Sequence, residues 1–215
     1  MIKCISIDGP DGSGKSTLVE LLSNEYEIVT LPKYYSMGMT PVDPEERKKW
    51  FRTFDVFDTT RIYISGHKIR LVAAAEFKKG LHYKFLEPSK KERIVVLDRG
   101  ALSVNAFAYA AIKMSSDMQD DEIIDYLLVE NDIEQFAKKI IDVSILLFDP
   151  NNLEEIISRR KYDECDEYLE RYQHEYYCKR KYEDERIKII SPTKTPEEIL
   201  NETKRVLTDL EVRNV

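Results

Sequence analysis

The sequence predicts a three-layer α/β fold, in which a five-stranded parallel sheet is flanked by helices. This fold class follows from the alternation of two patterns along the chain. Short apolar runs alternate with segments of helical periodicity along the whole chain. Strands that are separated by helices in this way form parallel sheets covered on both faces. No repeat, low-complexity tract or linker divides the 215 residues, so we expect a single domain over 1–215.

The elements follow from these patterns in chain order. Short apolar runs predict five strands at 2–7, 27–31, 93–97, 142–148 and 186–190. Three prolines and two tyrosines predict a loop over 32–44. Apolar residues three and four positions apart predict helices at 15–24, 44–85 with a break near Gly66, 102–114, 120–138, 153–160, 164–182 and 196–210.

The composition excludes several classes of protein. The net charge is −7, whereas a nucleic-acid-binding surface usually shows a strong basic field, so we expect no nucleic-acid partner. Three cysteines occur, an odd number without a Cys-x-x-Cys spacing, which argues against a zinc site or a disulfide framework and suits the reducing cytoplasm. We find no signal-peptide pattern and no apolar run of membrane-spanning length, and therefore expect no membrane association.

The strongest motif lies between the first strand and the first helix. Gly9 to Ser16 fits the pattern G-x-x-x-x-G-K-[ST] at every fixed position, and a predicted strand and helix flank it as the motif requires. Backbone N–H groups of such a loop cradle phosphates, the lysine reaches the β- and γ-phosphates, and the hydroxyl binds Mg²⁺. The motif predicts a P-loop NTPase fold with ATP and Mg²⁺ as cofactors. Its predicted nucleotide-binding residues are Gly9, Pro10, Asp11, Gly12, Ser13, Gly14, Lys15, Ser16 and Thr17.

A second charged group is predicted at the same edge of the sheet. The strand 93–97 leads into Asp98 and Arg99, at the carboxyl end where ligands of parallel sheets bind. A carboxylate there can hold Mg²⁺ or accept a proton, and an arginine can clamp phosphate oxygens. Ser16 and Asp98 are therefore the predicted metal ligands. Asp149 ends a similar strand, but a proline follows it, and we interpret it as part of a helix N-cap region.

Three segments of the chain resemble the thymidylate kinase family. Asp8 to Thr17 resembles the phosphate loop of that family, including the carboxylate at Asp11. Asp98 to Phe107 resembles its Asp-Arg-Tyr segment and the helix that follows. Leu146 to Arg160, together with Asp163 and the Tyr168-Leu169-Glu170-Arg171 stretch, resembles its strand, lid and post-lid helix. The order and spacing hold over most of the chain, and the resemblance is weak between 32 and 92.

The resemblance implies roles for several residues. It implies a lid at about 158–166, whose arginines Arg159 and Arg160 close on the transferred phosphoryl group. In some members a basic residue of the phosphate loop does this, but Ser13 stands there in this chain. The remaining candidates are catalytic Lys15, Asp98 and Arg99, and acceptor-binding Asp11, Arg99 and Asn105. From its position after the last strand, the segment 191–195 is expected to pass over the adenine.

The chain departs from the family at the acceptor site. Gly100 stands where the family usually has tyrosine, and Leu31-Pro32-Lys33-Tyr34-Tyr35 replaces its Arg-Glu-Pro-Gly stretch. These departures put the acceptor in question more than the fold. Aromatic and arginine residues of 50–70 are candidates for reading the acceptor base. Two pairings stay open, Phe57 with Arg61 and Phe54 with Arg70.

The resemblance implies a cytoplasmic enzyme that transfers the γ-phosphoryl group of ATP to a nucleoside monophosphate, in the first place dTMP. A deoxynucleoside kinase, or a kinase of another small molecule, is the nearest alternative. A nucleotide-binding switch with little turnover is a third, although no Asn-Lys-x-Asp motif of GTPases occurs. The family also forms homodimers, and the apolar segments 71–77 and 107–112 are the candidate contacts.

Overall fold

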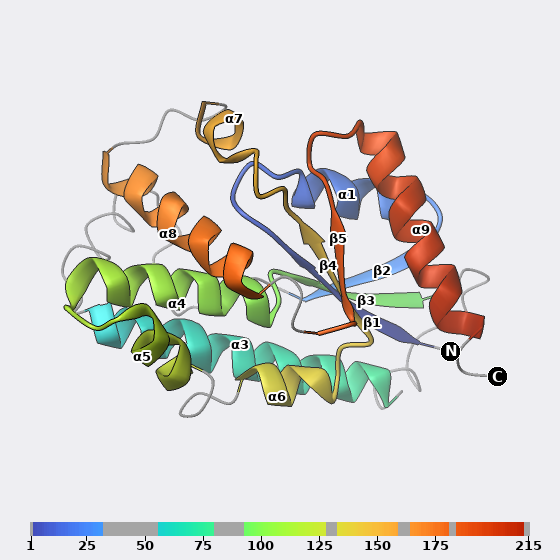
Figure 1. The fold of residues 1–215 in the computed structure, drawn as a ribbon. Coiled ribbons are helices and arrows are strands. Elements are labelled where there is room, and N and C mark those ends of the chain that lie inside the picture. Colours follow the sequence, from blue (N-terminus) through green and yellow to red (C-terminus); the bar gives the residue numbers. More distant parts are fainter. Residues whose placement is uncertain are drawn as a thin grey trace, which may run out of the picture.

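The computed structural model describes residues 2–31, 56–79, 93–127, 133–158, 164–180 and 184–212. Its centre is a five-stranded sheet in the order β2-β3-β1-β4-β5, and all four strand pairs are parallel (Figure 1). This confirms the predicted fold class. The strands are β1 (Lys3–Asp8), β2 (Glu27–Leu31), β3 (Arg93–Asp98), β4 (Val143–Leu147) and β5 (Ile187–Ile190).

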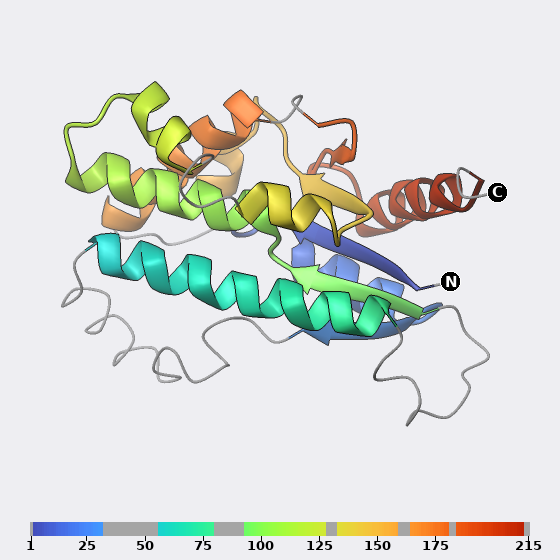
Figure 2. The same cartoon turned by 90° about the horizontal axis from the view of Figure 1, so that it is seen from below.

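Helices cover both faces of this sheet (Figure 1 and Figure 2). Alternate residues of a strand point to opposite faces, so Ile5 and Ile7 pack with α1 and α9 on one face, and Cys4 packs toward α3, α4 and α6 on the other. The helices are α1 (Lys15–Leu22), α3 (Val56–Lys78), α4 (Ala101–Ser115), α5 (Asp120–Asp125), α6 (Ile133–Lys138), α7 (Leu153–Ser158), α8 (Glu164–Arg180) and α9 (Pro196–Val212).

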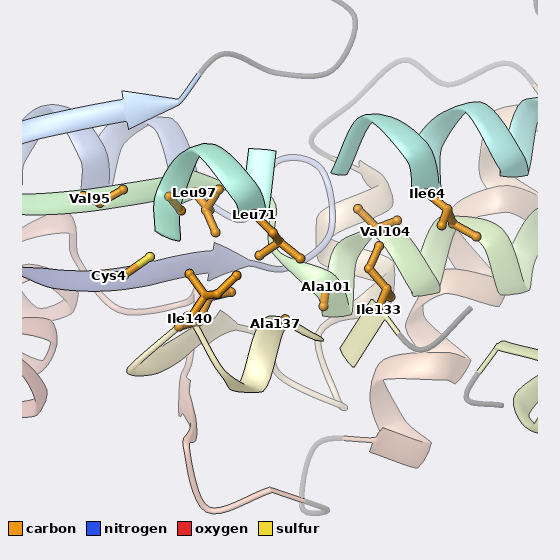
Figure 3. Packing of buried hydrophobic residues seen from close by; sticks show 12 residues of the cluster. Cys4, Ile64, Leu71, Val95, Leu97, Ala101, Val104, Ile133, Ala137 and Ile140 are labelled. Atoms are coloured by element: carbon orange, nitrogen blue, oxygen red, sulfur yellow. The ribbon is translucent and has the colours of Figure 1, made fainter. Parts of the chain in front are cut away.

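Two predicted helices differ from the observed ones. The helix α3 continues through Gly66 without the predicted break, because Ile64, Leu71 and Ala74 form one buried stripe against β3 and α4. Figure 3 shows Leu71 beside Leu97 of β3 and Ile64 beside Val104 of α4. The predicted helix 120–138 consists instead of α5 and α6, and residues 128–132 between them lie outside the described part. Predicted helical residues 44–55 and 80–85 lie outside it as well.

The segments predicted for dimer contacts place much of their apolar surface inside the chain. Leu71 and Ala74 on α3 are buried in the core, as are Tyr109 and Ile112 on α4. A homodimer therefore stays a prediction, and these four side chains are not its contacts. No helix in the described part of the chain combines the length and the apolar character that a membrane span requires.

The strand order positions the functional residues. The chain leaves β1 toward β2 and β3 on one side, and later returns to the other side of β1 through β4. Ligands of such sheets bind beyond the carboxyl ends of the strands, where the order reverses. The phosphate loop follows β1 at this point, and the register pairs Ile7 with Asp98, so the ends of β1 and β3 lie side by side.

Candidate active site at the carboxyl edge of the sheet

The phosphate loop has the geometry that its motif predicts. Gly14 is the N-cap of α1 with φ 90°, a left-handed conformation that glycine adopts without strain. Lys15 is buried, and its Nζ donates to the carbonyl oxygens of Gly9 at 2.8 Å and Pro10 at 2.7 Å. Burial, followed by the nearby charge of Arg99, lowers the pKa of Lys15 to about 8. The loop therefore holds its lysine in place through its own backbone.

Two features of the loop leave room for a ligand. The Ser13 hydroxyl is buried and has no hydrogen-bond partner among the described residues, so it offers a polar atom to a ligand. A pocket of about 230 Å³ lies beside the loop, between α1 and the segment after β5. Its lining residues are Gly12, Ser13, Gly14, Thr17, Leu18, Leu21, Pro192, Thr193, Lys194, Pro196 and Ile199. The segment 191–195, which is expected to pass over the adenine, lines this pocket through Pro192, Thr193 and Lys194.

Asp149 supports this loop rather than a ligand. Its Oδ1 accepts from the N–H of Asn151 at 2.9 Å, just before α7, as expected of a residue in a helix N-cap region. Its Oδ2 accepts from the hydroxyl of Ser191 at 3.1 Å. The carboxylate therefore joins the ends of β4 and β5.

The second predicted group lies beside the phosphate loop. Asp98 is the last residue of β3 and is buried. Arg99 follows with φ 70°, and its Nη2 donates to Oδ1 of Asp11 in an ion pair. Asp11 Oδ1 is also 3.8 Å from Lys15 Nζ. The structure therefore brings together Asp11, Lys15, Asp98 and Arg99, which the sequence predicted from two separate segments.

A buried carboxylate that we did not predict connects these two segments. Asp8 accepts four hydrogen bonds, from Ser6 Oγ at 2.7 Å, the Gly100 N–H at 2.8 Å, the Ser103 N–H at 2.9 Å and Ser103 Oγ at 2.8 Å. Burial raises the pKa of Asp8, and these bonds act against the rise. Ser103 Oγ in turn accepts from the N–H of Gly9 at 3.4 Å. The network joins the start of α4 to the phosphate loop.

The same network explains the glycine where the resembled family has tyrosine. A Cβ at position 100 would lie 2.4 Å from Ser6 Cβ and 2.7 Å from Asp8 Oδ2, which are not attainable distances between real atoms. Gly100 adopts an ordinary extended conformation, so space and not backbone freedom requires glycine here. Ser6 and Asp8 occupy the room that a side chain would need.

The two predicted metal ligands fit a magnesium site of the kind that phosphates complete. Ser16 is exposed on the first turn of α1, and Asp98 ends β3 at the same edge of the sheet. Hydroxyl and carboxylate oxygens are ligands that Mg²⁺ prefers, and it usually keeps waters and substrate oxygens besides. Among the described residues no group of three or more His, Cys, Asp or Glu side chains could hold a metal ion alone.

The predicted acceptor residues have different environments. Arg70 is buried under the end of β3, and its guanidinium donates to the carbonyl oxygens of Asp98 and Arg99. Asn105 is buried in α4, and its Nδ2 donates to Glu134 Oε1 at 3.0 Å. Phe57 and Arg61 belong to α3, but their side chains lie outside the described part, as do Phe54 and the lid arginines Arg159 and Arg160.

Comparison with known proteins agrees with this architecture. A thymidylate kinase from Candida albicans superposes with a TM-score of 0.60 and 16% identity, covering 97% of this chain and 92% of that one. At this identity the match shows the fold, which this chain shares with that kinase. Guanylate kinases of two Campylobacter jejuni strains are each 25% identical over 146 residues.

These matches have limits that bear on function. The alignment to the guanylate kinases covers 63% of this chain and 62% of theirs, so the chain spans about three fifths of the length of the curated relatives it matches. No family model matches the chain. The comparisons therefore support a P-loop kinase fold, and the identity of the acceptor has to be inferred from the residues of the site.

Proposed function

We propose that this chain is an ATP- and Mg²⁺-dependent nucleoside monophosphate kinase, with dTMP as its acceptor. The observation that carries the proposal is the position of Arg99. Its guanidinium lies against Asp11 of the phosphate loop, and Asp11 Oδ1 is also 3.8 Å from Nζ of Lys15, the group expected to bind the β- and γ-phosphates. A planar guanidinium suits phosphate oxygens, so a cation here favours an acceptor that carries a phosphate over an unphosphorylated nucleoside.

The residues of the site act by position and charge. Backbone N–H groups of 9–16 and the ammonium of Lys15 bind the β- and γ-phosphates, and Arg99 orients the acceptor phosphate for in-line attack. The positive charge of Lys15 and Arg99 neutralises the charge that spreads over the moving phosphoryl group. Bound Mg²⁺ would supply further neutralisation through Ser16 and Asp98. Closure of the lid at 158–166 would exclude water and limit hydrolysis of ATP.

The donor base would bind in the pocket beside α1. Leu21, Pro192 and Ile199 offer apolar surface, and Thr193 and Lys194 add polar residues to the lining. Such a mixture of apolar walls and few polar groups is typical of small-molecule sites. This supports ATP, or another purine nucleoside triphosphate, as the phosphoryl donor.

GMP is the second candidate acceptor. The guanylate kinases from Campylobacter jejuni, at 25% identity, favour it, whereas the three resembling segments and the Candida albicans structure favour dTMP. That thymidylate kinase is described as having broad substrate specificity, and this chain also lacks the tyrosine and the Arg-Glu-Pro-Gly stretch of the family. The acceptor must therefore be decided by experiment.

The deciding experiment measures ADP release from ATP and Mg²⁺ with dTMP, GMP, thymidine or guanosine as acceptor. We expect a monophosphate to stimulate release and the matching nucleoside to have little effect. Lys15→Ala is the control and should abolish turnover; near-normal activity in that variant would exclude this site. Stimulation by a nucleoside alone would replace the proposal with a nucleoside kinase, and slow hydrolysis with no stimulation would favour a nucleotide-binding switch.

A further inference from the structure

The turn after β3 carries Arg99 in an unusual backbone conformation. Its φ of 70° is left-handed, and it is the only positive value at a residue other than glycine in the described part of the chain. Such a conformation is unfavourable for an arginine and persists only where the surroundings impose it. The contacts of the turn must therefore supply the constraint.

A buried arginine holds the carbonyl side of this turn. Arg70, on α3, is 1% exposed. Its Nη2 donates to the Asp98 carbonyl oxygen at 2.7 Å, and its Nη1 donates to the Arg99 carbonyl oxygen at 3.1 Å. One planar guanidinium thus fixes two successive carbonyl groups, one on each side of the Arg99 Cα atom.

A buried carboxylate holds the amide side of the same turn. Asp8 is fully buried, and its Oδ1 accepts from the N–H groups of Gly100 at 2.8 Å and Ser103 at 2.9 Å. The N–H of Arg99 itself donates to the carbonyl oxygen of Ile7 at 3.0 Å. The peptide groups around Arg99 are therefore held by the Arg70 guanidinium on the carbonyl side and by the Asp8 carboxyl group on the amide side.

The Asp8 contact also relates the turn to the phosphate loop. Asp8 immediately precedes Gly9, and Ser103, which bonds to Asp8, accepts from the Gly9 N–H. Any shift of the turn would thus move Arg99 relative to the loop that holds the donor. Direct contact of Arg70 with an acceptor is not needed for it to influence acceptor binding.

We propose that Arg70 and Asp8 are positioning residues that clamp the turn 98–100 between them, and so fix Arg99 relative to the phosphate loop for acceptor binding. The clamp is a feature of the fold. Its effect on the acceptor rests on the proposed function, in which Arg99 binds the acceptor phosphate.

The experiment compares Arg70→Met and Asp8→Ala with a matched control, Arg180→Met. Arg180 is also a buried arginine, but its Nη2 donates to Glu134 Oε2, on α6, at 2.6 Å. Hydrogen exchange of the peptide 98–103 is measured by mass spectrometry in each full-length variant. We expect both clamp variants to exchange faster at this peptide, and Arg180→Met to leave it as in the wild type apart from any global loss of stability.

Steady-state kinetics with the acceptor found for the wild type provide the second measurement. We expect Arg70→Met to raise the acceptor KM by about tenfold or more while the ATP KM stays within about twofold. Arg70→Lys and Asp8→Asn keep part of the bonding capacity and should restore part of the acceptor affinity. Ser103→Ala removes only one of the four hydrogen bonds to Asp8, and it replaces Asp8→Ala in both measurements should that variant fail to fold.

The outcomes separate the clamp from the proposed function. Unchanged exchange at 98–103 in the clamp variants overturns the clamp, whatever the activity. Faster exchange with an unchanged acceptor KM overturns its role in acceptor binding. If no monophosphate stimulates the wild type, the proposed function fails, and the exchange data still decide whether Arg70 and Asp8 hold the turn.

Discussion

Arg99 and Asp11 form an ion pair that joins the turn after β3 to the phosphate loop. Arg99 is thus held beside the loop by Asp11. Under the proposed function, an acceptor phosphate would replace Asp11 as the partner of the Arg99 guanidinium. Both side chains are partly exposed, so a ligand can reach the pair. The pair makes Arg99 the most direct point at which to test acceptor binding.

We predict that Arg99→Met lowers kcat/KM for the acceptor by about 100-fold or more, because a charged donor to the phosphate is lost. ATP affinity should change little, since the loop N–H groups and Lys15 remain. Steady-state kinetics and calorimetric ATP titration check the two parts. The control is Arg171→Met, since Arg171 is a more exposed arginine on α8 that pairs with Glu154 and Glu167. An equal loss in both variants would contradict the role of Arg99.

Lys15 predicts a pH dependence of ATP binding. Its pKa in the free protein is about 8, lowered by burial and by Arg99, and bound phosphates would raise it. Binding therefore takes up protons near and above pH 8, about half a proton at pH 8, and the ATP Kd rises up to tenfold per pH unit above that. Calorimetry in two buffers of different ionisation enthalpy measures the uptake. The Lys15→Met variant should bind ATP weakly and without this proton uptake. An equal uptake in that variant would mean that a group other than Lys15 takes up the protons.

The close contact between position 100 and Ser6 predicts that substitutions at these two positions have coupled effects on stability. Gly100→Ala should destabilise the fold by about 3 kcal/mol, because the new Cβ lies 2.4 Å from Ser6 Cβ and the backbone must shift. Ser6→Gly removes that Cβ and its hydroxyl, so the double variant should recover part of the loss. Urea unfolding of the four proteins gives the coupling energy. Strictly additive effects would mean that Ser6 is not the obstacle.

The local parts of this site could be predicted from the sequence, and its long-range parts could not. The residues of the phosphate loop are consecutive in the sequence and match a known motif. Arg99 follows a predicted parallel strand, whose carboxyl end must lie at the same edge of the sheet as the loop. Asp8 gave no such signal, because its partners Gly100 and Ser103 are 92 and 95 residues away. The nearest hint was the replacement of the family's tyrosine by Gly100, which indicated a changed environment without naming Ser6 or Asp8.

The helix α3 shows the same distinction. Its periodicity predicted a helix and its aromatic and basic residues predicted an acceptor site, but periodicity cannot tell which side chains end in the core. Ile64, Leu71 and Ala74 pack in the core, and Arg70 turns toward backbone carbonyl groups that only the folded chain brings near. The continuous helix at Gly66 likewise depends on this packing, which outweighs the low helix propensity of one glycine.

His67 is a buried polar residue that the site does not use. It lies in α3 and is fully buried, and neither ring nitrogen has a hydrogen-bond partner among the described residues. Burial, together with the charge of Arg70, lowers the pKa of His67 to about 3. The ring is therefore neutral near pH 7, and no described residue compensates its two nitrogens for the hydration that they lose on folding, which costs stability.

We predict that His67→Leu raises the melting temperature at pH 7 by about 2–4 °C, equivalent to roughly 1 kcal/mol. His174→Leu is the matched control and should destabilise, because the His174 ring packs on Phe148 and its Nε2 lies 3.4 Å from the Asp149 carbonyl oxygen. Between pH 6.5 and about 3 only the unfolded chain protonates residue 67, so the wild type loses up to about 1.4 kcal/mol per pH unit from this group. His67→Leu should lose stability less steeply on acidification. Calorimetric scans from pH 7 to pH 4 measure both effects, and a less stable variant with unchanged acid dependence would show that His67 has a favourable partner.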